Sequence, residues 1–332
     1  MLQSMSRNSI LPWQQHNWEL LGSYINQQRI PQALLITGRK GLGKYQLANQ
    51  FTQSLLCTAR LDNGLFCGHC SSCVLFTAGT HPDFMLITPE EDKKIIGIDA
   101  IRQLITKLTL KPQFESHRVV LINPADQLNN AAANGFLKCL EEPNERTCVL
   151  LLTDKPAKLP ATIRSRCQKL AVTMPSQQQA TAWLNSQKVT ENIDVLLSLA
   201  QGAPLLAKEY ASDAVIKIRL QCFNDWVKVA KAELNPIVVA EQWHKQNVSM
   251  ILFWQMSWIT DMIKCRFGSD PKQLYHADLQ NNLQELSSKL NLKKVYTFYD
   301  LLISSQQKIE TQINKQLMFE EILIQWAKLN HG

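Results

Sequence analysis

Short runs of apolar residues alternate with helical patterns along the first half of the chain. Gly, Pro, Asn or Asp bounds each run, as expected for strands that are buried on both faces of a parallel sheet. The predicted strands are Ala33–Thr37, Phe84–Thr88, Val119–Ile122, Val149–Leu152 and Leu170–Val172. Between them, Ile98, Ile101, Ile105 and Leu108 recur at helical spacing. This alternation of strands and helices predicts a doubly wound α/β domain.

Further helices are indicated by the residues at their ends. One helix is predicted from about Asp126 to Glu142, where Pro143 stops it. After Met174 the pattern is helical throughout, and Ser176 is a good N-cap for the first of these helices. In the last segment, apolar residues recur at helical spacing and would form one stripe along a helix: Phe319, Ile322, Leu323, Trp326 and Ala327. Such a stripe is typical of packing inside a core or between subunits.

The composition changes near residue 173, which indicates a domain boundary. Nine of the 12 glycines precede it, so the first part is rich in turns and the second part in helices. The length of 332 residues is about twice that of a usual single domain. We expect an α/β domain over residues 1–173 with an insert at about 57–80, a small helical domain over 174–211 and a second helical domain over 212–332.

The net charge of +7, from 35 Lys and Arg against 28 Asp and Glu, is mildly basic. It suits a protein that works near nucleic acid, but it does not establish one. No apolar stretch resembling a signal peptide precedes Pro12, and the most apolar later segment, Val248 to Ile263, is too short and too polar to span a bilayer. We therefore expect a cytoplasmic protein that does not enter a membrane.

A phosphate-binding loop is predicted directly after the first strand. The chain runs from Thr37 through the sequence Gly-Arg-Lys-Gly-Leu-Gly-Lys into a helix. The glycines let backbone N–H groups turn toward a phosphate, and the helix N-terminus adds positive potential. The lysine would reach the outer phosphates of a nucleotide. The predicted cofactor-binding residues are Gly38, Gly41, Gly43 and Lys44.

The residues that hold magnesium in such sites are missing from this sequence. Tyr45 stands where a small Ser or Thr hydroxyl should be a metal ligand. The strand that ends at Ile122 continues into Asn123 and Pro124, neither of which carries a carboxylate. Asp126 lies beyond the strand end and is interpreted as a helix cap. We predict a site that no longer hydrolyses nucleotide, with a working ATPase as the alternative.

Four of the nine cysteines are clustered and are predicted to bind one zinc ion. Three of them follow one another at three-residue steps, and the fourth lies ten positions upstream. The predicted ligands are Cys57, Cys67, Cys70 and Cys73. Zinc prefers four tetrahedral ligands, and four thiolates leave no open position, so the metal would be structural. His69 and His81 are spare candidates, and four unligated cytosolic thiols are the alternative.

Two stretches carry a specific resemblance to a known family. One runs from Ala132 to Pro143 and contains Leu-Lys-Cys-Leu-Glu-Glu-Pro, and the other follows the strand at Val149 and ends in Ser165-Arg166-Cys167. Both resemble the AAA+ clamp-loader subunits of bacterial DNA polymerase III. The resemblance covers essentially the whole chain, including Pro12-Trp13 and the helical tail.

The resemblance implies roles for several parts of the chain. The two helical domains would be a lid and a collar, and the collar would join other subunits. Arg166 would be an arginine finger supplied in trans to the nucleotide of a neighbouring subunit; the alternative is a solvated surface arginine. Motor subunits of the family, gamma and tau, keep an intact nucleotide site, whereas the stator carries zinc and a decayed site. Tyr45, Asn123 and Leu205, which stands where a nucleotide-sensing basic residue is expected, all fit the stator.

The sequence is therefore identified as a stator of the DNA polymerase III clamp loader, which has no enzymatic activity by itself. It would help to load the sliding clamp onto primed DNA during replication, with structural zinc and without hydrolysing ATP. The implied partners are the gamma or tau motor subunits and the delta subunit, with the clamp and DNA reached through the complex. The alternatives are a gamma- or tau-like motor ATPase and a free-standing zinc-dependent DNA-binding module. The second lacks a basic cluster interleaved with aromatic residues around the cysteines.

Overall fold

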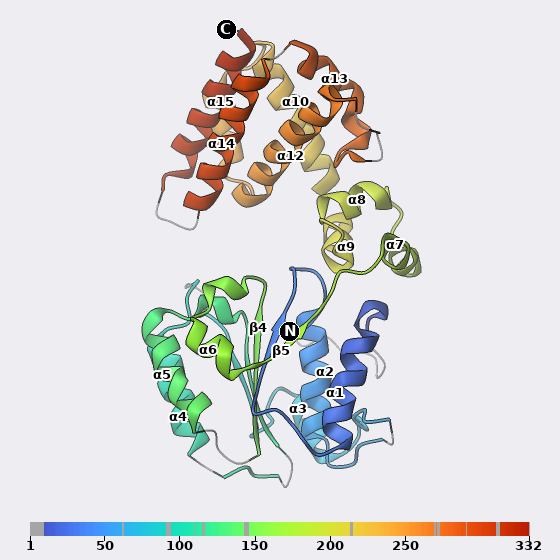
Figure 1. Ribbon diagram of the computed structural model, residues 1–332, viewed down its shortest axis with the longest axis vertical. Coiled ribbons are helices and arrows are strands. Elements are labelled where there is room, and N and C mark those ends of the chain that lie inside the picture. The colour runs from blue at the N-terminus through green and yellow to red at the C-terminus, as the bar shows by residue number, and fades with distance from the viewer. Residues whose placement is uncertain are drawn as a thin grey trace. The chain divides into compact units, whose positions relative to one another are not determined.

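Five parallel strands form a single sheet in the order β2-β3-β4-β1-β5 (Figure 1). Their bounds are β1 Ala33–Thr37, β2 Phe84–Ile87, β3 Arg118–Ile122, β4 Thr147–Thr153 and β5 Gln168–Ala171. Each lies within two residues of its predicted range. The computed structural model describes residues 10–61, 63–90, 94–109, 111–114, 117–142, 146–212, 215–268, 270, 273–289, 291–309 and 313–331. The predicted doubly wound α/β domain is confirmed.

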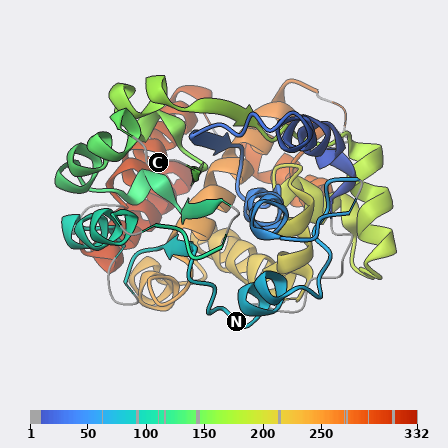
Figure 2. The same ribbon diagram turned by 90° about the horizontal axis from the view of Figure 1, so that it is seen from below.

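Helices cover both faces of this sheet. The helices α1, α2 and α3 lie on one side of the strands and α4, α5 and α6 on the other, as the blue and the teal-to-green ribbons of Figures 1 and 2 show. Their bounds are α1 Gln15–Asn26, α2 Lys44–Leu56, α3 Ser71–Thr77, α4 Ile98–Leu108, α5 Asn130–Glu141 and α6 Ala161–Arg166. On the second face, Phe136 and Ile163 pack with strand residues such as Val120 in one buried cluster. The three central strands β1, β3 and β4 are therefore buried on both faces, which is why they are nearly continuous apolar runs, whereas the edge strand β5 keeps exposed residues.

The helix predicted to begin at Asp126 begins later in the structure. Asp126 lies in a short 3-10 turn, and α5 begins at Asn130. The N-cap of α5 is Asn129, whose Oδ1 accepts a hydrogen bond from the backbone N–H of Ala132 at 2.7 Å. The interpretation of Asp126 as the cap is wrong, because its carboxylate is engaged elsewhere. The predicted stop at Pro143 lies outside the described residues.

The chain divides into two compact units, Met1–Trp183 and Leu184–Gly332, called unit 1 and unit 2 below. Unit 1 contains the sheet, and unit 2 is helical throughout its described residues. In unit 2, Val195 and Leu199 belong to the same buried cluster as the last helices of the chain. The three-part division at residues 173 and 211 stays a prediction.

Helices of unit 2 surround a core that is rich in tryptophan. The helix bounds beyond the sheet are α7 Gln177–Ser186, α8 Ile193–Leu199, α9 Pro204–Ser212, α10 Val215–Ala230, α11 Pro236–Trp243, α12 Val248–Arg266, α13 Gln280–Lys289, α14 Leu292–Lys308 and α15 Lys315–His331. The indole rings of Trp226 and Trp326 stack with centroids 3.8 Å apart, and Trp326 Nε1 donates to the carbonyl oxygen of Trp226 at 2.9 Å. The stripe predicted around Phe319 and Ile322 is buried in this core. No helix in the described part of the chain is both long and apolar enough to cross a bilayer.

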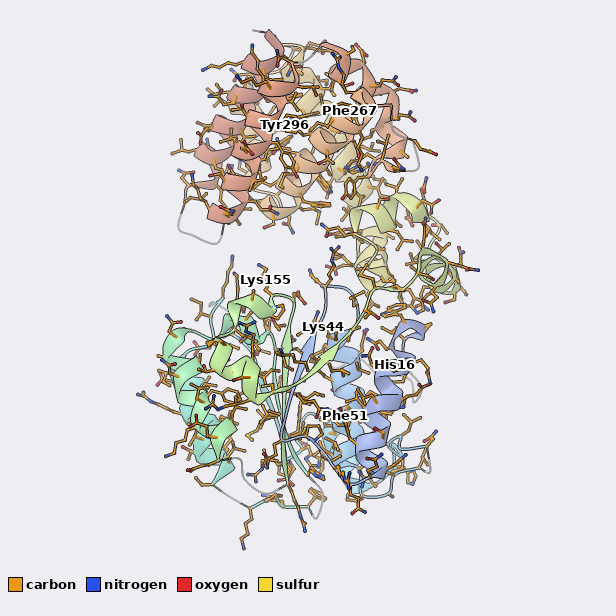
Figure 3. All side chains as sticks on the ribbon, viewed as in Figure 1. His16, Lys44, Phe51, Lys155, Phe267 and Tyr296 are labelled. Carbon is orange, nitrogen blue, oxygen red and sulfur yellow. The ribbon has the colours of Figure 1, made fainter. Side chains whose placement is uncertain are left out.

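Replacing Trp326 by phenylalanine should lower the free energy of unfolding of unit 2 by about 2 kcal/mol, because it removes ring volume from a packed core and one buried hydrogen bond. Urea denaturation followed by tryptophan fluorescence measures this change. The control is Tyr296→Phe, at a side chain that is 49% exposed (Figure 3), which should stay within about 0.5 kcal/mol of the wild type. Equal stability of the two variants would contradict the assigned role of the stack.

Candidate functional site

The phosphate loop lies between the end of β1 and the start of α2, where Lys44 is the first helical residue (Figure 3). Gly43 precedes it with a φ of 82°, a left-handed conformation that residues with side chains rarely adopt. A Cβ atom at this position would lie 2.4 Å from Leu11 Cδ1. The loop therefore requires glycine at this position, in agreement with the spacing seen in the sequence.

Lys44 is held by protein atoms inside its own loop. Its side chain is buried, and its Nζ donates to the carbonyl oxygens of Gly38 at 2.8 Å and of Arg39 at 3.0 Å. It also forms an ion pair with Asp154, which follows β4, the neighbour of β1 in the sheet. An ammonium group has three N–H donors, and these three contacts engage it. The lysine that should reach for phosphate thus has a protein partner for each donor.

The segment before α1 packs directly against the phosphate loop. Trp13 Nε1 and Gln14 Nε2 both donate to the carbonyl oxygen of Leu42, at 3.0 and 2.7 Å. Trp13 is buried and its ring contacts the edge of Trp183, with centroids 5.4 Å apart. These contacts hold the loop in place through side chains of the chain itself.

The residues around the expected magnesium position do not present the usual magnesium ligands. Tyr45 is half-buried, and burial raises the pKa of its phenol, so the side chain stays neutral. The backbone N–H of Asn123 donates to Ile87 at 3.0 Å, and no carboxylate stands at this position after β3. Thr153 Oγ1 donates to Asp126 Oδ1 at 2.6 Å. The first acidic side chain after β3 in the sequence is therefore already paired with Thr153, the last residue of β4.

The four predicted zinc ligands come together in the structure. Cys57 is the C-cap of α2 and Cys70 the N-cap of α3. The sulfur atoms of the four cysteines lie within 4.8 Å of one another, and those of Cys57 and Cys70 are 3.9 Å apart. Tetrahedral Zn–S bonds of about 2.3 Å require sulfur atoms about 3.8 Å apart. The cluster therefore fits a metal ion of this type, and within the described residues it is the one group of three or more suitable side chains with this geometry.

Backbone N–H groups point at the sulfur atoms and favour their charged form. The N–H of Cys67 donates to Cys57 Sγ at 3.3 Å, that of Cys70 to Cys67 Sγ at 3.3 Å, and that of Cys73 to Cys70 Sγ at 3.4 Å. Burial opposes ionisation of Cys70, but hydrogen bonds from Thr58 and from the backbone of Cys73 outweigh it and lower the pKa of that thiol to about 5. Burial raises the pKa of Cys57 and of Cys73. Hydrogen bonds of this kind orient thiolates around a metal.

Neither nearby histidine is in a position to replace a cysteine. His69 is exposed, with its Nδ1 3.1 Å from the carbonyl oxygen of Cys67. His81 is buried, but its Nε2 lies 2.9 Å from Ser72 Oγ and its Nδ1 accepts a hydrogen bond from the N–H of Asp83 at 3.1 Å. Both of its nitrogens are engaged in holding the insert against β2, so His81 is a structural residue here.

Arg166 ends helix α6, and its side chain is 37% exposed. Its Nη2 pairs with Glu141 Oε1 of α5 at 2.6 Å, and its Nη1 donates to the carbonyl oxygen of Thr162 at 3.0 Å. It lies at the surface of unit 1, where a neighbouring molecule could reach it. The sequence identified Arg166 but not its pairing with Glu141.

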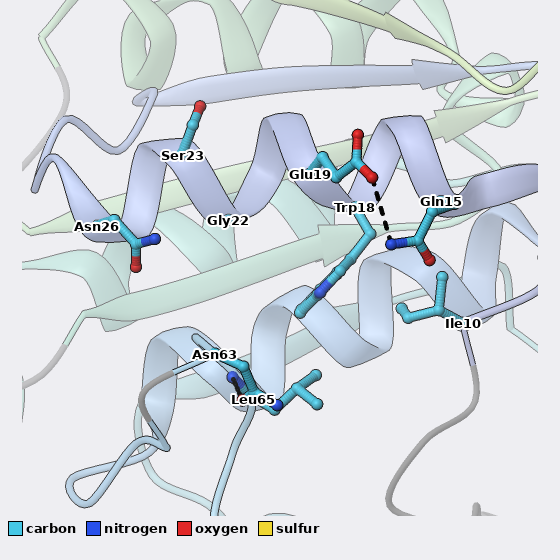
Figure 4. Close-up of a pocket in the computed structure, with 9 residues that line it drawn as sticks. All are labelled: Ile10, Gln15, Trp18, Glu19, Gly22, Ser23, Asn26, Asn63 and Leu65. Atoms are coloured by element: carbon cyan, nitrogen blue, oxygen red, sulfur yellow. Dashed lines mark hydrogen bonds between the residues drawn. The ribbon is translucent and has the colours of Figure 1, made fainter.

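One pocket, of about 590 Å³, opens between α1 and the loop before α3 (Figure 4). It is lined by Trp18, Glu19 and Asn26 of α1 and by Asn63 and Leu65 of the loop. None of the predicted site residues lines it. The pocket is therefore separate from the three candidate sites, which remain the phosphate loop, the cluster of four cysteines and Arg166.

A parallel sheet with a glycine-rich loop between its first strand and the next helix is typical of P-loop domains, and the comparisons below place this chain in the AAA+ class among them. The fold agrees with that of a DNA polymerase III gamma subunit-related protein from Thermotoga maritima, at a TM-score of 0.50 and 17% identity over 94% of this chain and 99% of that one. Residues 13–176 match the family model for "DNA polymerase III, delta subunit", and residues 214–328 match the model for its C-terminal part.

Curated relatives of the chain show which subunit family within this class it resembles. The chain is 33% identical to DNA polymerase III subunit delta' of Pseudomonas aeruginosa over 325 residues, covering 96% of this chain and 98% of the relative. It is 31% identical to the same subunit of Escherichia coli over 319 residues, covering 94% of each chain. The chain belongs to the family of DNA polymerase III delta' subunits. The resemblance seen in the sequence is confirmed.

Proposed function

We propose that this chain is the stator of a bacterial clamp loader, and that it joins gamma or tau motor subunits and a delta subunit without hydrolysing ATP. The complex places the sliding clamp on primed DNA, and this chain supplies shape, contact surface and Arg166. Membership of the delta' family supports the assembly role. The absence of hydrolysis is supported by one observation above all, the engagement of Lys44 by Gly38, Arg39 and Asp154.

The chemistry of hydrolysis gives the physical reason. Phosphoryl transfer needs a metal to neutralise charge and a group that orients the attacking water. Tyr45 offers no small hydroxyl to a metal, and Asn123 offers no carboxylate. Asp126 is paired with Thr153. A nucleotide that entered this loop would have to break the Lys44–Asp154 ion pair and would still lack the groups that cleave it.

The purified chain should hydrolyse ATP no faster than the buffer background, and Lys44→Ala should leave that rate unchanged. A phosphate-release assay with magnesium measures it. A motor subunit assayed in parallel serves as the positive control. Turnover above background that Lys44→Ala abolishes would instead identify a motor ATPase.

For the metal, we propose zinc held by Cys57, Cys67, Cys70 and Cys73. When bound, it supplies a structural cross-link rather than catalysis, because four thiolates leave no open coordination position. The cluster joins the end of α2 to the start of α3, a segment with little core of its own. A protein that loads clamps onto chromosomal DNA works in the bacterial cytoplasm, which is the compartment we propose.

The assembly role is tested by mixing the purified chain with motor and delta subunits. Mass measurement should find one complex that contains all three, and clamp loading onto primed DNA should require this chain. A chain that stays monomeric in the mixture, or loading at the full rate without it, would refute the proposal.

A further inference from the structure

Two elements hold the guanidinium group of Arg166 before any neighbour is present. One contact is the carboxylate of Glu141, from the last turn of α5, and the other is the backbone carbonyl of Thr162, one turn earlier in α6. A guanidinium carries five N–H donors. Among the described residues, these contacts engage one nitrogen each and leave the Nε donor and one donor on each Nη for an outside acceptor.

This pairing has little value for the stability of the chain. The side chain of Arg166 is 37% exposed and that of Glu141 is 50% exposed, and ion pairs at such exposure contribute little to folding. Its effect is on conformation. A free arginine samples many rotamers, whereas this one is restrained by two hydrogen bonds, one of them charge-assisted.

We propose that Glu141 is a positioning residue for the arginine finger: it holds the guanidinium of Arg166 in the orientation that meets the phosphates of a nucleotide bound by the neighbouring subunit. The inference rests on the proposed function of Arg166. Orientation matters because a guanidinium binds phosphate through a planar fork of parallel donors. A side chain ordered in advance also avoids the entropy loss of ordering it during the reaction.

Glu141 also carries a cost, since its negative charge lies near the phosphates that Arg166 must meet. The two effects of Glu141 on hydrolysis have opposite signs. If its main effect is to orient Arg166, removing the carboxylate slows ATP hydrolysis. If its main effect is repulsion of the phosphates, removing the carboxylate speeds ATP hydrolysis. The two contacts that fix the guanidinium plane favour orientation as the main effect.

The chain offers a matched control. Glu142 is the next residue, and its side chain is also exposed. Its backbone N–H donates to the carbonyl oxygen of Lys138 at 3.1 Å, but its carboxylate forms no hydrogen bond or ion pair with another described residue. Glu141→Gln and Glu142→Gln remove the same charge at neighbouring positions. Only the first weakens a contact with Arg166.

The experiment uses the assembled complex with motor and delta subunits, and measures kcat and KM for ATP in the presence of clamp and primed DNA, together with the rate of clamp loading. Glu141→Gln should lower kcat at the site facing this chain by about three- to tenfold, with KM little changed, as expected for a loosened but present finger. Glu141→Asp should retain part of the lost rate. Glu142→Gln should match the wild type.

A double-mutant cycle separates positioning from a general effect on structure. Adding Glu141→Gln to Arg166→Ala should cause no further loss, because Glu141 acts through the arginine. Additive losses, an equal loss in Glu142→Gln, or a wild-type or faster rate in Glu141→Gln would overturn the role of Glu141. Wild-type kinetics in Arg166→Ala alone would remove the arginine finger from the proposed function, and the positioning role with it.

Discussion

Replacing Arg166 with alanine should slow ATP hydrolysis at the motor site that faces this chain by about a thousandfold or more, the usual contribution of an arginine finger. The side chain is exposed and its ion pair with Glu141 is at the surface, so the variant should fold and assemble as the wild type does. Total hydrolysis by the complex should fall only in part, because the other motor sites keep their own interfaces. Clamp loading should fall further, since it requires the sites to act together.

Two variants serve as controls for this result. Arg166→Lys should restore little activity, because an ammonium cannot present a planar fork of donors. Arg102→Ala removes another exposed arginine of unit 1, one that is paired with Asp99 at 3.0 Å, and it should have no effect. If the complex with Arg166→Ala loads clamps at the wild-type rate, Arg166 is a surface residue and only the scaffold role remains.

The purified chain should contain one zinc ion, and removing it should unfold the insert around Cys57 to Cys73. Structural zinc sites bind with apparent free energies of about 10–16 kcal/mol at neutral pH, which is far more than the weak core of this segment supplies. Elemental analysis measures the metal, and limited proteolysis with and without a strong chelator measures the order of the insert. Binding should weaken on acidification, because the ligands must lose their protons to bind zinc.

Substitution of a single cysteine ligand tests whether the zinc site stabilises only the insert. Cys70→Ser should increase cleavage within the insert while far-UV circular dichroism of the sheet and helices stays close to that of the wild type. Cys265→Ser, at a cysteine of unit 2, should retain the zinc and the protection. Absence of stoichiometric zinc would refute the metal assignment, and global unfolding of Cys70→Ser would refute the view of the site as a local cross-link.

The central strands could be predicted from the sequence because they are buried on both faces. A strand such as β3 is apolar at each of its interior positions and is bounded by polar residues, so its ends are visible in the sequence. Helix starts were harder to predict. Asp126 has the residue type of a cap, but its carboxylate accepts a hydrogen bond from Thr153 at the end of β4, and Asn129 caps the helix instead.

The cysteine cluster was predictable because its ligands lie close together in the chain, whereas the partners of the other site residues were not. Asp154 lies 110 positions from Lys44, and they meet because β1 and β4 are adjacent in the sheet. Glu141 and Arg166 are 25 positions apart on separate helices. Contacts of this kind depend on topology, and no local spacing in the sequence encodes them. Knowledge of the strand order would have been enough to suggest the first.

Helix α2 is a single rod that joins the two sites of unit 1. Its first residue is Lys44 of the phosphate loop, its C-cap is Cys57 of the thiolate cluster, and a helix of this length spans about 20 Å. A helix that is anchored at both ends can neither slide along its axis nor turn about it. A zinc ion bound by the four cysteines would therefore do more than close the insert. It would fix the axial position of the helix that carries the loop lysine, and so brace the phosphate loop from a distance.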